Sequence, residues 1–225
     1  MLLPRKARIW YPGANYHIMC RGNHRHDIYK DDEDRQVYLT LLGETRKEYN
    51  FYLHSYCLMT NHVHLHIETA DININISIIM KRINLLYAQF FNNKYNFVGH
   101  LFQDRFKSEL IETYQYHLEI GRYIHLNPVR ANMTELPIDY TWSSYRVYMG
   151  IRQDSLVTTE KTLGYFSEPR VDRYRLYVES ELSRIGVHTE VEAGARHNSS
   201  GSLRNCVGVV SPHNIPTQWR KILTN

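Results

Sequence analysis

Histidine alternates with apolar residues in the segment HVHLHIET, which begins at residue 62. His62, His64 and His66 take every second position, and the positions between them hold Val, Leu and Ile. Because the side chains of a β-strand alternate between two faces, this pattern predicts a strand with one histidine face and one apolar face. The chain is therefore expected to build a sheet around this segment.

The remaining periodicity predicts the elements that complete the sheet. We expect strands at 16–21, 51–59, 62–69 and, with a bend, 99–112, and the two central strands form a hairpin around Thr60-Asn61. Helical spacing predicts helices at 31–49, 76–91 and 113–125, the last ended by Pro128 or followed directly by it. This order predicts an α+β fold: a ferredoxin-like antiparallel sheet with a β-α-β-β-α-β core, helices against one face, and one added helix.

The chain divides into a principal domain and a C-terminal appendage. We place the domain at 1–154, including an aromatic-rich segment at 137–150 that packs back on the core, and the appendage at 155–225. Within the appendage we expect a helix near 169–183 and a flexible stretch at 194–202.

Composition excludes several classes of protein. With 43% hydrophobic residues the chain can fold around a core, yet it has no apolar run of the ~18 residues that a membrane span needs. Three cysteines without CxxC spacing argue against a disulfide scaffold or a zinc ribbon. The N-terminal residues do not resemble a secretion signal. We therefore expect a cytoplasmic protein with reduced thiols and no membrane partner.

Positive charge is concentrated near the N-terminus. Residues 1–30 contain six Lys or Arg residues against Asp27 alone, although the net charge of the whole chain is only +4. A basic arm with neighbouring aromatic residues suits a nucleic-acid backbone, and an ordinary solvated surface explains it equally well.

Two groups of residues are candidates for a metal site. Imidazoles at i and i+2 on a strand, here His62 and His64, are close enough to share one divalent ion, whereas His66 lies too far along; the alternative is a polar face of exposed imidazoles. The helix at 113–125 carries Tyr116, Glu119, Tyr123 and Asn127 on one stripe, which by itself fits an amphipathic face followed by a helix stop.

Together these residues resemble a known family. Five ordered segments are similar to the single-tyrosine HUH transposases of the IS200/IS605 type, and most closely to the REP-associated tyrosine transposases. They are YHIMCRGN at 16–23, LMTNHVHLHIET at 58–69, GHLFQDRFKS at 99–108, RYIHLNPVRAN at 122–132 and WSSYRVYMG at 142–150. Thr60 departs from the family, which usually has proline there, and the change affects a turn and no ligand.

The resemblance implies a mechanism. His62, His64 and Asn127 would hold Mg²⁺ or Mn²⁺, and Tyr123 would be the nucleophile that forms a 5′-phosphotyrosine link to single-stranded DNA with hairpin or palindromic elements. It also implies a bacterial, nucleoid-associated protein that acts as a monomer or a homodimer. The candidate phosphate contacts are Arg5, Lys6, Arg8, Arg21, Arg105, Lys107 and Arg130.

Two other functions remain open from the residues. A non-catalytic single-stranded nucleic-acid-binding module can use the same fold, but it would need aromatic residues on an open sheet face. A zinc hydrolase would activate water with three protein ligands and would not use Tyr123. For the transposase we also expect an open sheet face, which the tyrosine approaches from its helix.

Overall fold

The computed structural model describes residues 8–71 and 73–186 and confirms the ferredoxin-like sheet. Its four antiparallel strands lie in the order β2-β3-β1-β4. Their bounds are β1 Asn15–Arg21, β2 Phe51–Leu58, β3 His62–Thr69 and β4 Lys107–Ile111. The expected extended segment at 99–112 becomes a regular strand only at Lys107, and a single bridge between Gly22 and Phe102 joins the preceding loop to the end of β1.

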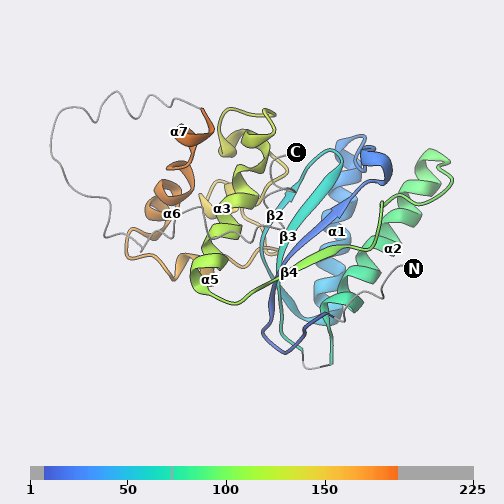
Figure 1. The fold of residues 1–225 in the computed structure, drawn as a ribbon, viewed down its shortest axis with the longest axis horizontal. Helices are drawn as coiled ribbons and strands as arrows, with labels where there is room; N and C mark the ends of the chain where they lie inside the picture. The colour runs from blue at the N-terminus through green and yellow to red at the C-terminus, as the bar shows by residue number, and fades with distance from the viewer. Residues whose placement is uncertain (1–7, 72, 187–225) are drawn as a thin grey trace, which may run out of the picture.

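Helices α1 (Asp32–Tyr49) and α2 (Ile76–Tyr95) lie side by side on one face of the sheet (Figure 1). Asp31 and Asp34 form a capping box at the start of α1, and the Asn75 side chain accepts from two backbone N–H groups at the start of α2. These caps satisfy backbone donors that helix ends leave unpaired. The apolar strand residues pack against these helices in the main core, with Ile18, Leu65 and Ile83 fully buried.

Helix α3 (Tyr114–Arg130) crosses the opposite face of the sheet (Figure 1). The Thr113 side chain caps its first turn by accepting from the N–H of Tyr116. The expectation of an open sheet face is wrong, because α3 contacts β2, β3 and β4. The alternative expectation of exposed imidazoles is wrong as well, since His64 is only 2% exposed. The polar residues on this face of the sheet are thus enclosed between the strands and α3.

The expectation that Pro128 ends this helix is also wrong. Pro128 lies inside α3, which continues to Arg130, and the N–H of Ala131 donates to the carbonyl of Asn127. Proline removes one N–H and disfavours helical backbone in the residue before it. Burial of Pro128 and Val129 holds the last turn in place, so Asn127 adopts helical backbone despite the proline that follows.

The segment after α3 packs back on it. It contains a 3₁₀ turn at Pro137–Asp139 and the helices α4 (Tyr145–Tyr148), α5 (Glu160–Leu163), α6 (Arg170–Glu179) and α7 (Leu182–Ile185). The helix expected near 169–183 is therefore present, as two pieces. The Tyr174 hydroxyl is hydrogen-bonded to Nδ1 of His125 on α3 at 2.9 Å, and Arg122 forms an ion pair with Glu181.

The division of the chain at residue 154 stays a prediction, although residues 155–186 are firmly packed: Tyr174, Val178 and Leu182 belong to the main core. The stretch expected to be flexible, 194–202, lies outside the described residues. Within the described ranges, no helix combines the length and the hydropathy that crossing a bilayer requires.

Candidate active site

The first two histidines of β3 lie at the end of the sheet that α3 approaches with its C-terminal half. His64 is buried, and its Nδ1 lies 2.9 Å from Nε2 of His17 on β1. His62 is partly buried, and its Nδ1 donates to Oδ1 of Asn61 at 2.7 Å. In the tautomer in which His64 Nδ1 donates to His17, the His62 ring and the His64 ring each keep a lone pair on Nε2. Such a second hydrogen bond is how metal-binding histidines are usually oriented.

Both imidazoles are held neutral. Burial lowers the pKa of His62 to about 4, and the nearby positive charge of Arg21 adds to the effect. The pKa of His64 falls well below its usual value, again chiefly through burial and then through the neighbouring His62 and His17. Because only a neutral imidazole can bind a metal, the two rings are ready to do so at neutral pH.

Helix α3 places Tyr123 and Asn127 directly over these histidines. The Tyr123 ring meets the His64 ring edge to face, with centroids 5.4 Å apart, and lies 5.8 Å from the His17 ring. Asn127, one turn further along α3, lies close enough to His62 and to Tyr123 to influence the pKa of both side chains. The one-turn spacing of Tyr123 and Asn127 therefore brings a hydroxyl and an amide to the same pair of imidazoles.

Opposing influences act on the Tyr123 hydroxyl. Burial raises the pKa of Tyr123, whereas the hydrogen bond with Asn127 and the positive charges of Arg130 and Arg21 lower it in part. The Arg130 guanidinium carbon lies 5.3 Å from the centre of the Tyr123 ring. Two of the residues expected to contact phosphate thus lie beside the candidate nucleophile, and the phenol stays protonated unless a further positive charge is added.

The donor set fits a divalent cation with oxygen and nitrogen ligands. Two imidazole nitrogens and one amide oxygen supply three donors, which leaves positions for substrate oxygens and water. In residues 8–71 and 73–186, no three His, Cys, Asp or Glu side chains converge on a common metal position. Asn127, beside His62 and Tyr123, is the candidate for the third donor.

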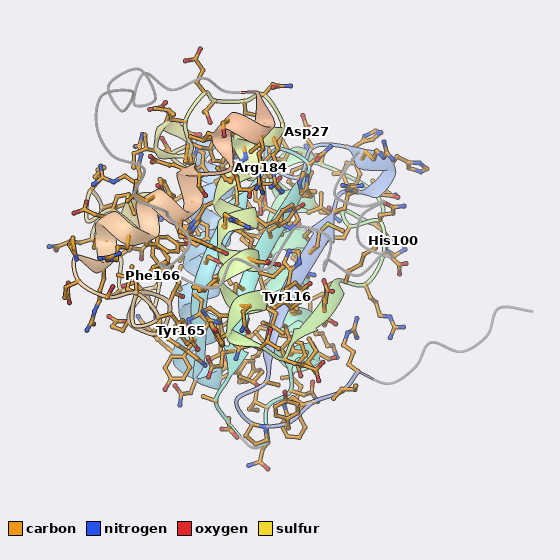
Figure 2. All side chains as sticks on the ribbon, turned by 60° about the vertical axis from the view of Figure 1, so that its left-hand side comes forward. Asp27, His100, Tyr116, Tyr165, Phe166 and Arg184 are labelled. Atoms are coloured by element: carbon orange, nitrogen blue, oxygen red, sulfur yellow. The ribbon has the colours of Figure 1, made fainter. Side chains whose placement is uncertain are left out.

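The other candidates for ligand or nucleophile lie elsewhere. Glu119 is half-buried beside Arg122 and Glu181, away from the paired histidines. The Tyr116 hydroxyl is buried beside Glu109, whose charge adds to burial in raising the pKa of Tyr116, and Figure 2 shows this tyrosine low on α3.

His66 belongs to a second histidine cluster with His54 and His117. Its ring centroid lies 4.9 Å from that of His54 and 4.3 Å from that of His117. His54 donates in turn to Glu68, which also pairs with Lys161. His66 therefore packs within a structural group that joins β2, β3 and the C-terminal segment.

Two site residues were missed from the sequence. His17 was assigned to a strand without a role, and Asn61 was assigned to a turn. The signal for His17 is strand parity: it pairs with His66 across the antiparallel register of β1 and β3, so it must share the histidine face. Asn61 immediately precedes His62, and only its side-chain geometry reveals the contact.

The remaining basic candidates are spread over other parts of the molecule. Arg5 and Lys6 lie outside the described residues. Arg8 donates to Ser108 Oγ and to the Phe106 carbonyl and stacks over the Phe106 ring, so it anchors the arm to β4. Arg105 and Lys107 are exposed. Their contacts with DNA remain predictions.

Comparison with known proteins defines the class. The fold is similar to a REP-associated tyrosine transposase solved with a bound REP hairpin: the TM-score is 0.57 and the identity 14%, over 69% of this chain and 98% of that chain. A candidate transposase from Deinococcus radiodurans is similar at a TM-score of 0.39 and 18% identity, over 54% of this chain and 95% of that chain. No curated protein matches the chain significantly.

Residues 11–127 match the family model described as Transposase IS200 like. The match spans more than half of the 225 residues, and the chain therefore belongs to the IS200-like transposase family.

Proposed function

We propose that this transposase cleaves and rejoins single-stranded DNA through a covalent link to Tyr123, with Mg²⁺ or Mn²⁺ held by His62, His64 and Asn127. The observation that carries the proposal is the convergence of strand and helix: two neutral imidazoles, one amide and one phenol meet in a single partly buried cluster. Membership of a transposase family supports DNA as the substrate.

The reaction we infer is a transesterification at phosphorus. The Tyr123 oxygen forms a bond to the phosphorus, and the bond from phosphorus to O3′ breaks. The phenol loses its proton and O3′ gains one. The product is a 5′-phosphotyrosine with a free 3′-hydroxyl. Since one phosphate ester replaces another, a second 3′-hydroxyl can attack the link and rejoin strands without ATP.

The chain's own residues orient these groups. His17 and Asn61 hold the rings of His64 and His62, and the Asn127 amide lies near both His62 and Tyr123. Arg130 and Arg21 supply positive charge where negative charge gathers on the phenol and the phosphate. A divalent cation bound there would polarise the scissile phosphate and neutralise its charge.

Hairpin ends are the substrate that we propose. The similar REP-associated tyrosine transposase was solved with a REP hairpin, and the fold of the two proteins is the same. A hairpin provides a duplex for recognition and an unpaired flank that can bend into a site enclosed by α3. The chain would act on such ends as a monomer or a homodimer.

One incubation separates this reading from the two alternatives. A labelled single-stranded hairpin with unpaired flanks is mixed with the protein and Mn²⁺, and the products are resolved by denaturing electrophoresis. A covalent transposase gives label that migrates with the protein. A non-catalytic nucleic-acid-binding module gives intact, free DNA, and a zinc hydrolase gives shortened DNA without attachment; either result would overturn the proposal.

A further inference from the structure

A cavity lies against the loop that follows β1, which is hydrogen-bonded to Asn61 next to His62. It has a volume of about 350 Å³, in the range typical of small-molecule sites, and is lined by Asn23, His26, Asp27, Lys30, Phe91, Phe97 and Leu101. Figure 2 shows Asp27 at the end of the sheet toward which α3 runs beyond Tyr116. The mechanism inferred above does not use any of these residues.

The chemistry of the cavity matches a nucleobase. The Phe97 ring is partly exposed and stands nearly perpendicular to the buried Phe91 ring, with centroids 5.9 Å apart, so a flat group can stack on Phe97. Among the other lining residues, the Asn23 side chain can donate and accept, and the Asp27 carboxylate accepts hydrogen bonds. Exposed Lys30 and Arg25 add positive charge at the rim, where a phosphate backbone would pass.

A short chain of hydrogen bonds connects the cavity wall to His62. The backbone N–H of Gly22 donates to the carbonyl of Asn61, and the Asn61 side-chain amide donates to the carbonyl of Arg25. The carbonyl oxygen of that same Asn61 side chain accepts from Nδ1 of His62. The loop that forms the cavity and the ring that would bind the metal are thus held by one amide.

The loop can lie this close only because residue 22 is glycine. A Cβ at Gly22 would stand 2.0 Å from the carbonyl oxygen of His26 and 2.9 Å from Cγ2 of Ile28. The following residues His24 and Arg25 have φ values of 51° and 62°, in the left-handed region. This folded-back loop places Asp27 among the residues that line the cavity.

We propose that this cavity captures one unpaired nucleobase of the DNA strand and, through Asn61, fixes the strand beside His62. The inference rests on the proposed function and adds a base-binding position to it. Because the Asp27 carboxylate only accepts hydrogen bonds, the cavity prefers the bases with an exocyclic amino group (adenine, cytosine and guanine) over thymine, whose single donor is N3–H.

The test measures binding of a fluorescein-labelled hairpin with an unpaired adenine tail, next to the same hairpin with an abasic or a thymine tail. Phe97→Leu should weaken binding of the adenine tail roughly 10-fold and leave the abasic tail unchanged. Tyr165→Leu, which changes a partly exposed aromatic residue elsewhere, is the matched control and should affect neither. Asp27→Asn should abolish the preference for adenine over thymine.

Several outcomes would overturn the inference. Equal binding of adenine and abasic tails by the unaltered protein would show that no base is held. If Phe97→Leu weakened binding of the adenine and the abasic tail equally, Phe97 would have a structural role only. If that variant does not fold, Asp27→Asn provides the test, because Asp27 is exposed. An unchanged base preference in Asp27→Asn would then exclude the cavity as the base site.

The two proposals fail separately. A covalent adduct without any dependence on the tail bases removes the cavity and leaves the nucleophile in place. Base-dependent binding without an adduct removes the covalent mechanism and leaves the cavity.

Discussion

The two faces of the sheet are built from the same strands and serve different ends. On β3, Leu65 lies in the apolar core under α1 and α2, while the adjacent His64 lies under α3 with His17 and Tyr123. Both residues are buried, at 0% and 2% exposure. Apolar burial stabilises the fold, whereas buried imidazoles and phenols must be hydrogen-bonded or they cost free energy. On this sheet the apolar face forms the core, and the polar face holds both the candidate site and the second histidine cluster.

The largest effect on DNA cleavage should come from removing the hydroxyl oxygen of Tyr123, which covers the polar face of the sheet. Tyr123→Phe removes the nucleophile and little else, so strand cleavage and adduct formation should fall below detection while hairpin binding stays within about 2-fold of the unaltered protein. Denaturing gels measure the first and fluorescence anisotropy the second. Tyr116→Phe, two turns earlier on α3, is the control and should cleave normally; loss of cleavage there alone would show that the wrong tyrosine was chosen.

Replacing the paired histidines should abolish the metal-dependent reaction. His62→Ala and His64→Ala should each give no cleavage at any Mn²⁺ concentration tested, whereas His66→Ala, in the second histidine cluster, should retain metal-dependent activity. EDTA should stop the unaltered protein, and Mg²⁺ or Mn²⁺ should restore it. Full activity in chelator would contradict the mechanism.

Leu65→Ala is the partner of His64→Ala on the other face. Deleting a fully buried leucine should lower the free energy of unfolding by about 2–5 kcal/mol, measured by urea titration. The surviving folded protein should still bind Mn²⁺. If Leu65→Ala abolished metal binding as His64→Ala does, the two faces would not be separable.

A smaller but graded effect is expected at Asn127. Asn127→Ala removes the amide oxygen and keeps Pro128, so metal affinity should fall by at least about 10-fold, and cleavage should slow with it. Asn127→Asp places a carboxylate oxygen at nearly the same position and should retain binding. Calorimetric titration of Mn²⁺ compares the three proteins; unchanged affinity in the alanine variant would leave Asn127 with a structural role only.

His17 should act through His64. His17→Phe keeps a ring of similar shape and removes the acceptor for His64 Nδ1, so Mn²⁺ affinity should fall by roughly 10- to 100-fold, as for other residues that orient a metal ligand. Hairpin binding without metal should not change. Equal Mn²⁺ affinity in the variant would show that the 2.9 Å contact does not orient His64.

Lowering the pH should destabilise the protein through the polar face. Burial lowers the pKa of His17 and His62 to about 4 in the folded protein, against about 6.5 when unfolded. Between these values the unfolded chain binds more protons, so the free energy of unfolding should fall as pH is lowered from 6.5 toward 4, by about 1.4 kcal/mol per pH unit for each such histidine. Saturating Mn²⁺ should reduce this loss of unfolding free energy, because metal binding requires neutral imidazole rings. A urea midpoint that does not change between pH 7 and pH 5 would contradict this.

Much of the fold follows from local patterns. The alternation in β3 and the helical spacing of α1, α2 and α3 predicted the order of elements, and that order predicted the sheet. Pro128 misled the prediction because the tertiary burial of α3's last turn outweighs the local preference of proline.

The site was predictable in part. His62, His64, Tyr123 and Asn127 were found through spacing and family resemblance, and the structure brings them together. The burial of the histidine face could not be predicted, because nothing local shows that α3 covers it. His17 bonds to His64, which is distant in sequence, and the contact of Asn61 with its neighbour His62 depends on the side-chain rotamers. Sequence periodicity contains neither kind of information.

The central claim is that Tyr123 forms the covalent bond, and peptide mapping of the adduct tests it most directly. The protein is incubated with a hairpin substrate and Mn²⁺, digested with nuclease and trypsin, and analysed by mass spectrometry. The account predicts that the residual nucleotide is attached to the peptide containing Tyr123, at the tyrosine oxygen. Attachment at Tyr116 or any other residue, or cleaved DNA with no modified peptide, would contradict it.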